Sequence, residues 1–157
     1  MKPKLTKLAA SIIVTSLGAA GPALSTDMSS LPPVQVQGVV SYITGGIGDD
    51  EAAAFKHAAA TYPLEMLFAQ KARPKDEFLA DVKVTVRDRS DHSLLETTAE
   101  GPFLLATLPA GKYKIEAEHR GERKQQSVEI RPGTHRRAVF VWAPRDESEQ
   151  PVLSSAN

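Results

Sequence analysis

The chain has 157 residues, of which 41% are hydrophobic and 24% charged, with 19 basic against 19 acidic side chains. This length fits one domain that buries a core without the metal or disulfide cross-links that become usual below about 40 residues. Because the sequence contains no cysteine, a disulfide framework and a lipid-modified cysteine are both excluded.

Residues 1–25 have the pattern of a signal peptide. Three lysines precede an apolar run at 8–20, which is shorter than the roughly 20 residues of a membrane-spanning helix. Ala23 and Ser25 are small residues at the −3 and −1 positions of a cleavage site after Ser25. We therefore expect a periplasmic protein with no membrane span after cleavage. Secretion and an uncleaved N-terminal anchor are the alternatives.

Removal of this segment changes the charge balance. The first 25 residues contain three lysines and no acidic residue, so 16 basic side chains remain against 19 acidic ones. Nucleic-acid-binding domains are usually basic. The sequence therefore predicts no nucleic-acid partner.

The mature chain is expected to begin with a linker and a strand. Residues 26–33 are polar and end in two prolines, which indicates a linker. Residues 34–43 alternate, with Val34 and Val36 on one face of a predicted first strand. Gly38 interrupts the pattern and predicts a bulge or a close backbone approach.

A glycine-rich loop then leads into a predicted helix at 49–62. The segment is rich in alanine, which favours helix, and its apolar residues recur along one face. Asp49 or Asp50 is expected to cap the helix, and Pro63 to end it. The loop and first turn form a candidate site of five residues: Gly45, Gly46, Gly48, Asp49 and Asp50.

An anion and Ca²⁺ are the two candidate ligands for this loop–helix site. Glycines before a helix N-terminus can hold an anion, but the Lys-Ser/Thr of a phosphate loop is missing and the acidic first turn would repel phosphate. The carboxylates suit Ca²⁺, although their spacing is not that of an EF-hand. The favoured interpretation is a flexible connection followed by a helix with an acidic first turn.

Alternating segments continue after the helix. The clearest lies at 112–119, where Tyr113, Ile115 and Ala117 share one face and charged side chains occupy the other. Further strands are expected at 64–68, 80–88, 93–98, 103–107, 127–131 and 136–142.

Short strands at regular spacing, separated by Gly and Pro turns, predict a mainly β fold. We expect an antiparallel two-sheet β-sandwich of Greek-key type at 34–143, with one inserted α-helix. Residues 144–157 are polar, contain two prolines and are expected to be a disordered tail.

Part of this region resembles a known family. Glu100-Gly101-Pro102-Phe103 followed by Leu108-Pro109-Ala110-Gly111-Lys112-Tyr113 resembles the D-x-x-G-x-F and L-P-P-G-x-Y segments of carboxypeptidase regulatory-like domains, which are prealbumin-like or transthyretin-like sandwiches. The resemblance spans about 80–142 and implies a stabilising or binding module without catalytic residues. Pro102 departs from the family pattern. The helix insertion is also outside that pattern and resembles exported proteobacterial proteins of unknown role.

Basic side chains near two turns form a candidate contact surface. The surface consists of Arg120, Arg123, Lys124, Arg136 and Arg137, and together they would attract an anionic envelope polymer or lipid headgroups. The favoured alternative is a set of solvated strand ends that prevent edge-to-edge pairing.

The remaining reactive side chains give no catalytic or metal-binding motif. The four histidines, His57, His92, His119 and His135, are dispersed, so we predict no metal and no cofactor. Ser41 and Ser93 lack the G-x-S-x-G elbow of hydrolases. The aromatic residues Tyr42, Tyr62, Tyr113 and Trp142 are expected to face the core rather than to form a platform for stacking sugars.

These observations lead to three ranked hypotheses. The first is a non-enzymatic periplasmic interaction or structural module whose partner is an envelope protein or polysaccharide. The second is a carbohydrate-binding module of the starch-binding type, which needs exposed coplanar aromatic rings. The third is a small hydrolase, which needs a nucleophile and a base within hydrogen-bond reach in a pocket. The sequence makes no prediction about oligomeric state.

Overall fold

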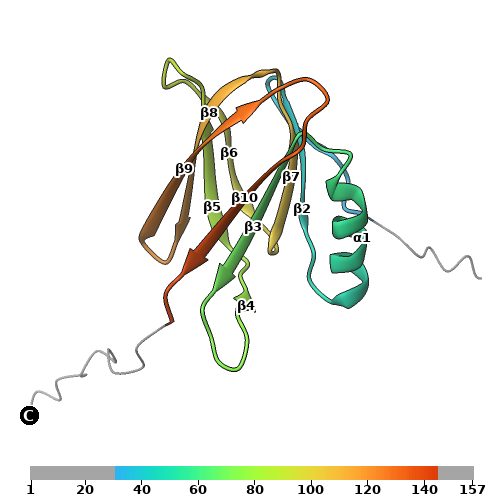
Figure 1. Cartoon of the computed structure of the whole chain (residues 1–157), viewed down its shortest axis with the longest axis vertical. Coiled ribbons are helices and arrows are strands. Elements are labelled where there is room, and N and C mark those ends of the chain that lie inside the picture. Colours follow the sequence, from blue (N-terminus) through green and yellow to red (C-terminus); the bar gives the residue numbers. More distant parts are fainter. Residues whose placement is uncertain (1–30, 145–157) are drawn as a thin grey trace, which may run out of the picture.

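The computed structural model describes residues 31–144. The predicted signal peptide at 1–25, residues 26–30 of the linker and residues 145–157 of the tail lie outside this range. The described residues form two β-sheets and a single helix, which confirms the predicted two-sheet sandwich with one helix. The two sheets face each other, and the helix lies on the outer side of one of them (Figure 1).

The first sheet, called sheet A, contains β1 (Gln35–Gln37), β2 (Val40–Gly45), β3 (Leu64–Gln70), β4 (Glu77–Phe78), β7 (Phe103–Thr107) and β10 (Arg136–Trp142). Its strand order is β1-β2-β7-β3-β10, and β4 pairs with the end of β3. Sheet B contains β5 (Val82–Arg87), β6 (Ser93–Ala99), β8 (Gly111–His119) and β9 (Glu122–Ile130), in the order β6-β5-β8-β9. The helix α1 (Asp49–Ala59) connects β2 to β3.

The main hydrophobic core lies between the sheets. In β8, Tyr113, Ile115 and Ala117 are buried while Lys112 and Lys114 are exposed, as the alternation predicts. The three valines of β5 and the inward residues of β3 and β10 complete the same cluster. Two apolar inner faces stacked in this way are the usual core of a β-sandwich.

The position of β7 explains why the chain needs a helix between β2 and β3. β7 pairs antiparallel with both strands, so β2 and β3 run parallel to each other. Parallel strands need a long crossover connection, usually a helix. α1 makes this crossover on the outer face of sheet A, where Phe55 and Ala59 form a second core cluster with Ile43, Phe103 and Leu105 (Figure 1).

This arrangement buries β3 on both faces. Every residue from Leu64 to Ala69 is buried, because one face meets sheet B and the other meets α1. β10 pairs with β3 in parallel, with Phe140 opposite Phe68. That pair departs from the fully antiparallel sandwich that the sequence suggested. The chain enters β10 from β9 in the other sheet, so no hairpin turn fixes the strand direction.

The predicted helix end and cap are wrong. α1 ends at Ala59 rather than at 62, because the N–H groups of Thr61 and Tyr62 bond to carbonyl oxygens only three residues back and tighten the chain before Pro63. The N-cap residue is Gly48, and no side chain caps the helix. The two aspartates lie in the first turn instead, where negative charge suits the dipole.

The predicted strand at 34–43 is also wrong, because the structure has a hairpin there. Gly38, with φ 56°, lies in the turn between β1 and β2, and Gln35 lies opposite Tyr42. In β1, the side chains of Gln35 and Gln37 therefore lie on the face of sheet A that meets sheet B, and the Val36 side chain lies on the opposite face. Val36 is 72% exposed. A glycine that adopts positive φ reverses the chain where the sequence pattern alone suggested continuity.

Tyr113 explains the Leu-Pro-Ala-Gly-Lys-Tyr motif. Its buried ring anchors β8, and its hydroxyl donates a hydrogen bond of 2.8 Å to the Pro109 carbonyl oxygen. The same bond defines the tyrosine corner of other sandwiches. Burial raises the pKa of the Tyr113 hydroxyl, and the negative charge of Asp88 adds to this effect. The motif thus fixes the turn between the two sheets.

Tyr113→Phe is expected to lower the free energy of unfolding by about 1 kcal/mol, the net contribution of one hydrogen bond. Urea unfolding followed by circular dichroism measures this change. Tyr62→Phe is the control, since the Tyr62 hydroxyl makes no hydrogen bond within residues 31–144. A loss no larger than that of the control would show that the corner does not stabilise the turn.

Candidate functional site

The structure divides the five basic candidates between opposite ends of the sandwich. Arg120, Arg123 and Lys124 lie at the β8–β9 turn, whereas Arg136 and Arg137 begin β10 beside the turn after β9. Nine residues of β9 separate the two turns, a distance of roughly 25–30 Å at the usual rise per residue. Figure 1 shows the β8–β9 turn near the end of β10 and far from its start. The predicted single basic surface is therefore wrong.

Most of these cations also have acidic partners. Arg123 Nε lies 2.6 Å from Glu118, and Lys124 Nζ lies 2.9 Å from Glu122 and 5.9 Å above the Trp142 ring. At the other end, the Arg136 Nε donates to the Glu129 carbonyl at 3.2 Å. Such exposed pairs contribute little to stability. They do reduce the positive potential that an anionic polymer would meet.

The Arg123–Glu118 pair changes the acidity of the carboxyl. The hydrogen bond from Arg123 lowers the pKa of Glu118, and this effect exceeds the opposing effect of burial. At the far end of β9, the hydrogen bond from Arg131 lowers the pKa of Glu129 in the same way. A carboxyl with a lowered pKa in the folded state stabilises the fold above its unfolded pKa. That contribution is lost as the pH falls through the folded pKa.

Arg123→Gln is expected to raise the pKa of Glu118 towards the ordinary glutamate range and to leave that of Glu129 unchanged. Titration of the side-chain carboxyl carbons by NMR measures both groups in one experiment. Glu129 is the internal control because its partner is Arg131. An unchanged Glu118 titration would contradict the pairing.

The loop–helix candidate is a packing feature. Gly46, with φ 93°, lies against the Phe103 ring, so that an added Cβ would overlap the ring. The Glu51 carboxylate turns back and accepts the Ile47 N–H at 3.0 Å, which occupies a donor that an anion would need. Gly48, Asp49 and Asp50 are exposed. The glycines thus allow the loop to close over Phe103.

Gly46→Ala is expected to destabilise the fold by about 1–3 kcal/mol more than Gly48→Ala, because only the first adds an overlap with a buried ring. Gly48 has a similar φ of 87° with nothing within 4 Å of an added Cβ. Its ψ of 161° puts it in a region used almost only by glycine, so it reports the backbone cost alone, about 1–3 kcal/mol. Thermal unfolding of both variants measures the difference, and equal losses would contradict the packing role.

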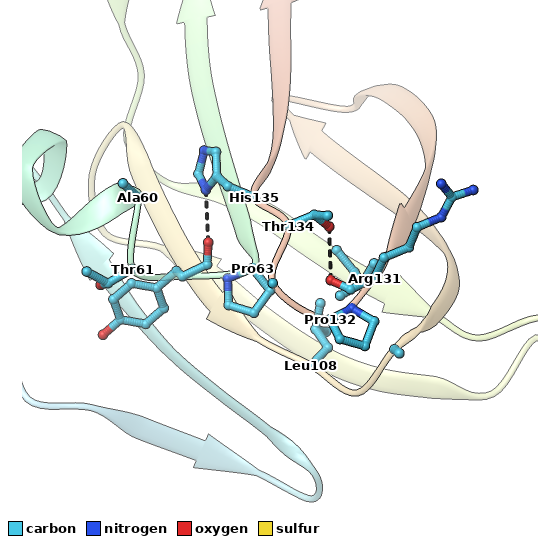
Figure 2. Close-up of a pocket in the computed structure, with 12 residues that line it drawn as sticks. Ala60, Thr61, Pro63, Leu108, Arg131, Pro132, Thr134 and His135 are labelled. Atoms are coloured by element: carbon cyan, nitrogen blue, oxygen red, sulfur yellow. Dashed lines mark hydrogen bonds between the residues drawn. The ribbon is translucent and has the colours of Figure 1, made fainter.

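A cleft of about 500 Å³ lies where the end of α1 meets the turns before β8 and after β9. We call it the helix-end cleft. Figure 2 shows Pro63, Leu108 and Pro132 close together in it, whereas the Arg131 side chain extends away from them. Its lining comprises Ala60, Thr61, Tyr62, Pro63, Leu108, Ala110, Ile130, Arg131, Pro132, Gly133, Thr134 and His135.

Three hydroxyl groups line the cleft, those of Thr61, Tyr62 and Thr134, and the two threonine hydroxyls are bonded to backbone carbonyls. Thr61 donates to the Ala58 carbonyl at 2.7 Å. Thr134 donates to the Arg131 carbonyl at 2.9 Å, as Figure 2 shows. Each threonine hydroxyl thus uses its proton within the protein, while its oxygen can still accept a hydrogen bond from a ligand. The cleft combines an apolar floor with acceptor groups, which suits a ligand that brings N–H or O–H donors.

His135 lines the cleft but has both ring nitrogens engaged. Its Nδ1 lies 2.9 Å from the Tyr62 carbonyl oxygen, and its Nε2 lies 3.2 Å from Glu65 Oε2. The Glu65 side chain is only 8% exposed and also meets Arg137 Nε at 3.3 Å. A general base needs one free ring nitrogen facing the reacting group. His135, just before β10, instead joins the turn after α1 to β3 at the rim of the cleft.

Sequence reasoning missed Glu65 and the cleft. Glu65 lies inside the predicted apolar strand at 64–68, and an acidic residue in a strand buried on both faces signals a buried ion pair. Its partners lie 70 and 72 positions away in the chain. Only the parallel pairing of β3 with β10 brings them together.

The other candidates for chemistry remain apart. Between residues 31 and 144, no group of three or more His, Cys, Asp or Glu side chains is placed to hold a metal ion. Ser41 lies in β2 and Ser93 in β6, and neither forms a hydrogen bond with a histidine in that range. No helix in the same range is long and apolar enough to cross a membrane.

The aromatic residues are arranged mainly as core residues. Tyr42, Tyr113 and Trp142 are buried, at 6%, 6% and 2% exposure. Tyr62 differs because it is only half-buried and lines the helix-end cleft. The expectation that all four face the core is therefore correct for three. The fourth supplies a single ring at a cleft.

No family model matches the chain, and no curated protein matches it significantly. Function is therefore inferred from the fold and from the helix-end cleft.

Proposed function

We propose that the chain is a non-enzymatic periplasmic β-sandwich module that binds an envelope protein through the helix-end cleft. The observation that carries this proposal is the chemistry of the cleft. It pairs an apolar floor with hydroxyl acceptors, and its one histidine has both nitrogens bonded within the fold. Such a cleft suits recognition better than proton transfer.

The resemblance of residues 80–142 to carboxypeptidase regulatory-like domains agrees with this proposal. Those domains act as stabilising or binding modules beside enzymes or alone. The Tyr113–Pro109 hydrogen bond gives the shared motif a structural role, so this part of the resemblance concerns the scaffold. Function in such scaffolds depends on sites added to them, and α1 with its adjoining turn is the added part here.

A carbohydrate ligand is the second candidate, and Tyr62 is the observation that favours it. Its half-buried ring adjoins the Thr61 hydroxyl in the cleft lining. Aromatic rings bind the apolar faces of sugars, and hydroxyl acceptors bind sugar O–H groups. A starch-binding platform needs coplanar exposed rings, however, and the cleft has one aromatic ring. A protein partner therefore ranks first.

A photo-crosslinking amino acid at Ala110 tests the proposal in native cells that express the full chain. Ala110 is an exposed residue of the cleft lining, and Thr98 is an exposed residue of β6 that serves as the control position. We expect one discrete crosslinked species from Ala110 in the periplasmic fraction and none from Thr98. Equal crosslinking from both positions would overturn the cleft as the contact. Recovery of the chain in the cytoplasm would overturn the location.

The two ligand classes are separated by Tyr62→Ala and Tyr62→Phe. Calorimetric titration with soluble peptidoglycan fragments and malto-oligosaccharides should show at least tenfold weaker binding for the alanine variant if a sugar stacks on the ring. The phenylalanine variant keeps the ring and should bind almost normally. No heat with either sugar, together with a protein crosslink at Ala110, identifies the protein partner.

A further inference from the structure

The strands at the sheet edges differ in how well their outer backbone groups are protected from pairing with another chain. β6 and β9 border sheet B, β1 and β10 border sheet A, and the two-residue β4 pairs only with the end of β3. An unpaired strand edge can pair with another chain, so proteins usually protect such edges with charges, short strands or covering groups. Of β1, β6, β9 and β10, one strand has an outer edge that is open to a partner.

The edges of β9 and β10 are joined to each other by side chains. Gln126 Nε2 donates to the Val139 carbonyl at 2.6 Å, and Trp142 Nε1 donates to the Glu122 carbonyl at 3.1 Å. The Arg136 bond to the Glu129 carbonyl joins the same edges at the other end. Charged residues also lie at both ends of β9 and at the start of β10. This side of the sandwich is therefore closed.

The edge of β6 is protected by β1. The Gln37 side-chain oxygen accepts the Glu96 N–H at 2.8 Å, so a backbone donor of β6 is already satisfied. The Tyr42 hydroxyl reaches across the same side, donates to the Gln35 side-chain oxygen at 2.9 Å and accepts from the Thr97 hydroxyl at 3.1 Å. These bonds hold the glutamines of β1 in fixed positions.

Of these protections, the outer edge of β1 has only its short length of three residues. Within residues 31–144, β1 pairs only with β2. Gln37 and Val40 flank the two-residue turn as a hydrogen-bonded pair, so alternation leaves the backbone groups of Val34 and Val36 pointing away from β2. No charged residue occurs from 28 to 48.

The side chains of this edge are apolar and exposed. Val34 is 58% exposed, Val36 is 72% exposed and Val39 in the turn is 65% exposed. β-Branched residues in an uncharged, alternating segment favour pairing with another strand. The strand is also already ordered by its glutamine hydrogen bonds, which lowers the entropic cost of pairing.

We propose that β1 pairs with β1 of a second copy of this chain, antiparallel and about a two-fold axis. In the register that uses the outward backbone groups, Val34 of each copy lies opposite Val36 of the other, and the two Gln35 residues face each other. A two-fold interface must be self-complementary. This edge fulfils that condition because it carries no charge to repel its own copy.

Two double variants that differ at one position test both the pairing and its register. Val34→Asp/Val36→Asp places like charges directly opposite each other across the two-fold axis, which disfavours pairing. Val34→Lys/Val36→Asp places opposite charges there, which favours it. Both change the same two exposed positions, so both are expected to fold like the original chain, as circular dichroism checks.

Sedimentation velocity of the full chain, measured from about 10 µM to about 1 mM, gives the result. We expect concentration-dependent dimers for the unchanged chain and for Val34→Lys/Val36→Asp. The like-charge variant should weaken dimerisation at least tenfold. A monomer at every concentration overturns the proposal. Equal dimerisation by both double variants, or its loss in both, overturns it as well.

Discussion

The insertion of β7 between two parallel strands determines most of this structure. Because β2 and β3 flank β7 and run in the same direction, the chain must return over the face of the sheet before it can form β3. α1 is that return segment, and it buries the outer face of sheet A. Its C-terminal end supplies one wall of the helix-end cleft. The helix and the cleft are thus consequences of strand order.

Local chemistry explains which parts of the fold the sequence predicts well. In β5 and β8 one face meets the core and the other meets solvent, so alternation is visible residue by residue. The turn before Tyr113 is equally readable because its bond partner lies four residues away. β3 is less informative, since both faces are buried. Gly38 shows another limit, because alternating residues on either side of a turn look like one strand.

The candidate sites were harder to predict because pairing over long sequence distances creates them. The basic residues lie near two successive turns of the chain, but the length of β9 places these turns at opposite ends of the sandwich. Conversely, Glu65 and His135 are 70 positions apart and meet at the rim of the cleft. Sequence spacing reports contacts within a turn or a hairpin. It carries no information about which end of a sandwich two turns occupy.

The parallel pairing of β10 with β3 has a consequence for the order of assembly. β3 forms early in the chain, but its second hydrogen-bonded neighbour is the last strand of the domain. Sheet A therefore remains incomplete until almost the entire domain has been synthesised. Contacts between such distant segments slow folding. A chain that has been synthesised only as far as β9 would thus still expose one unpaired edge of β3.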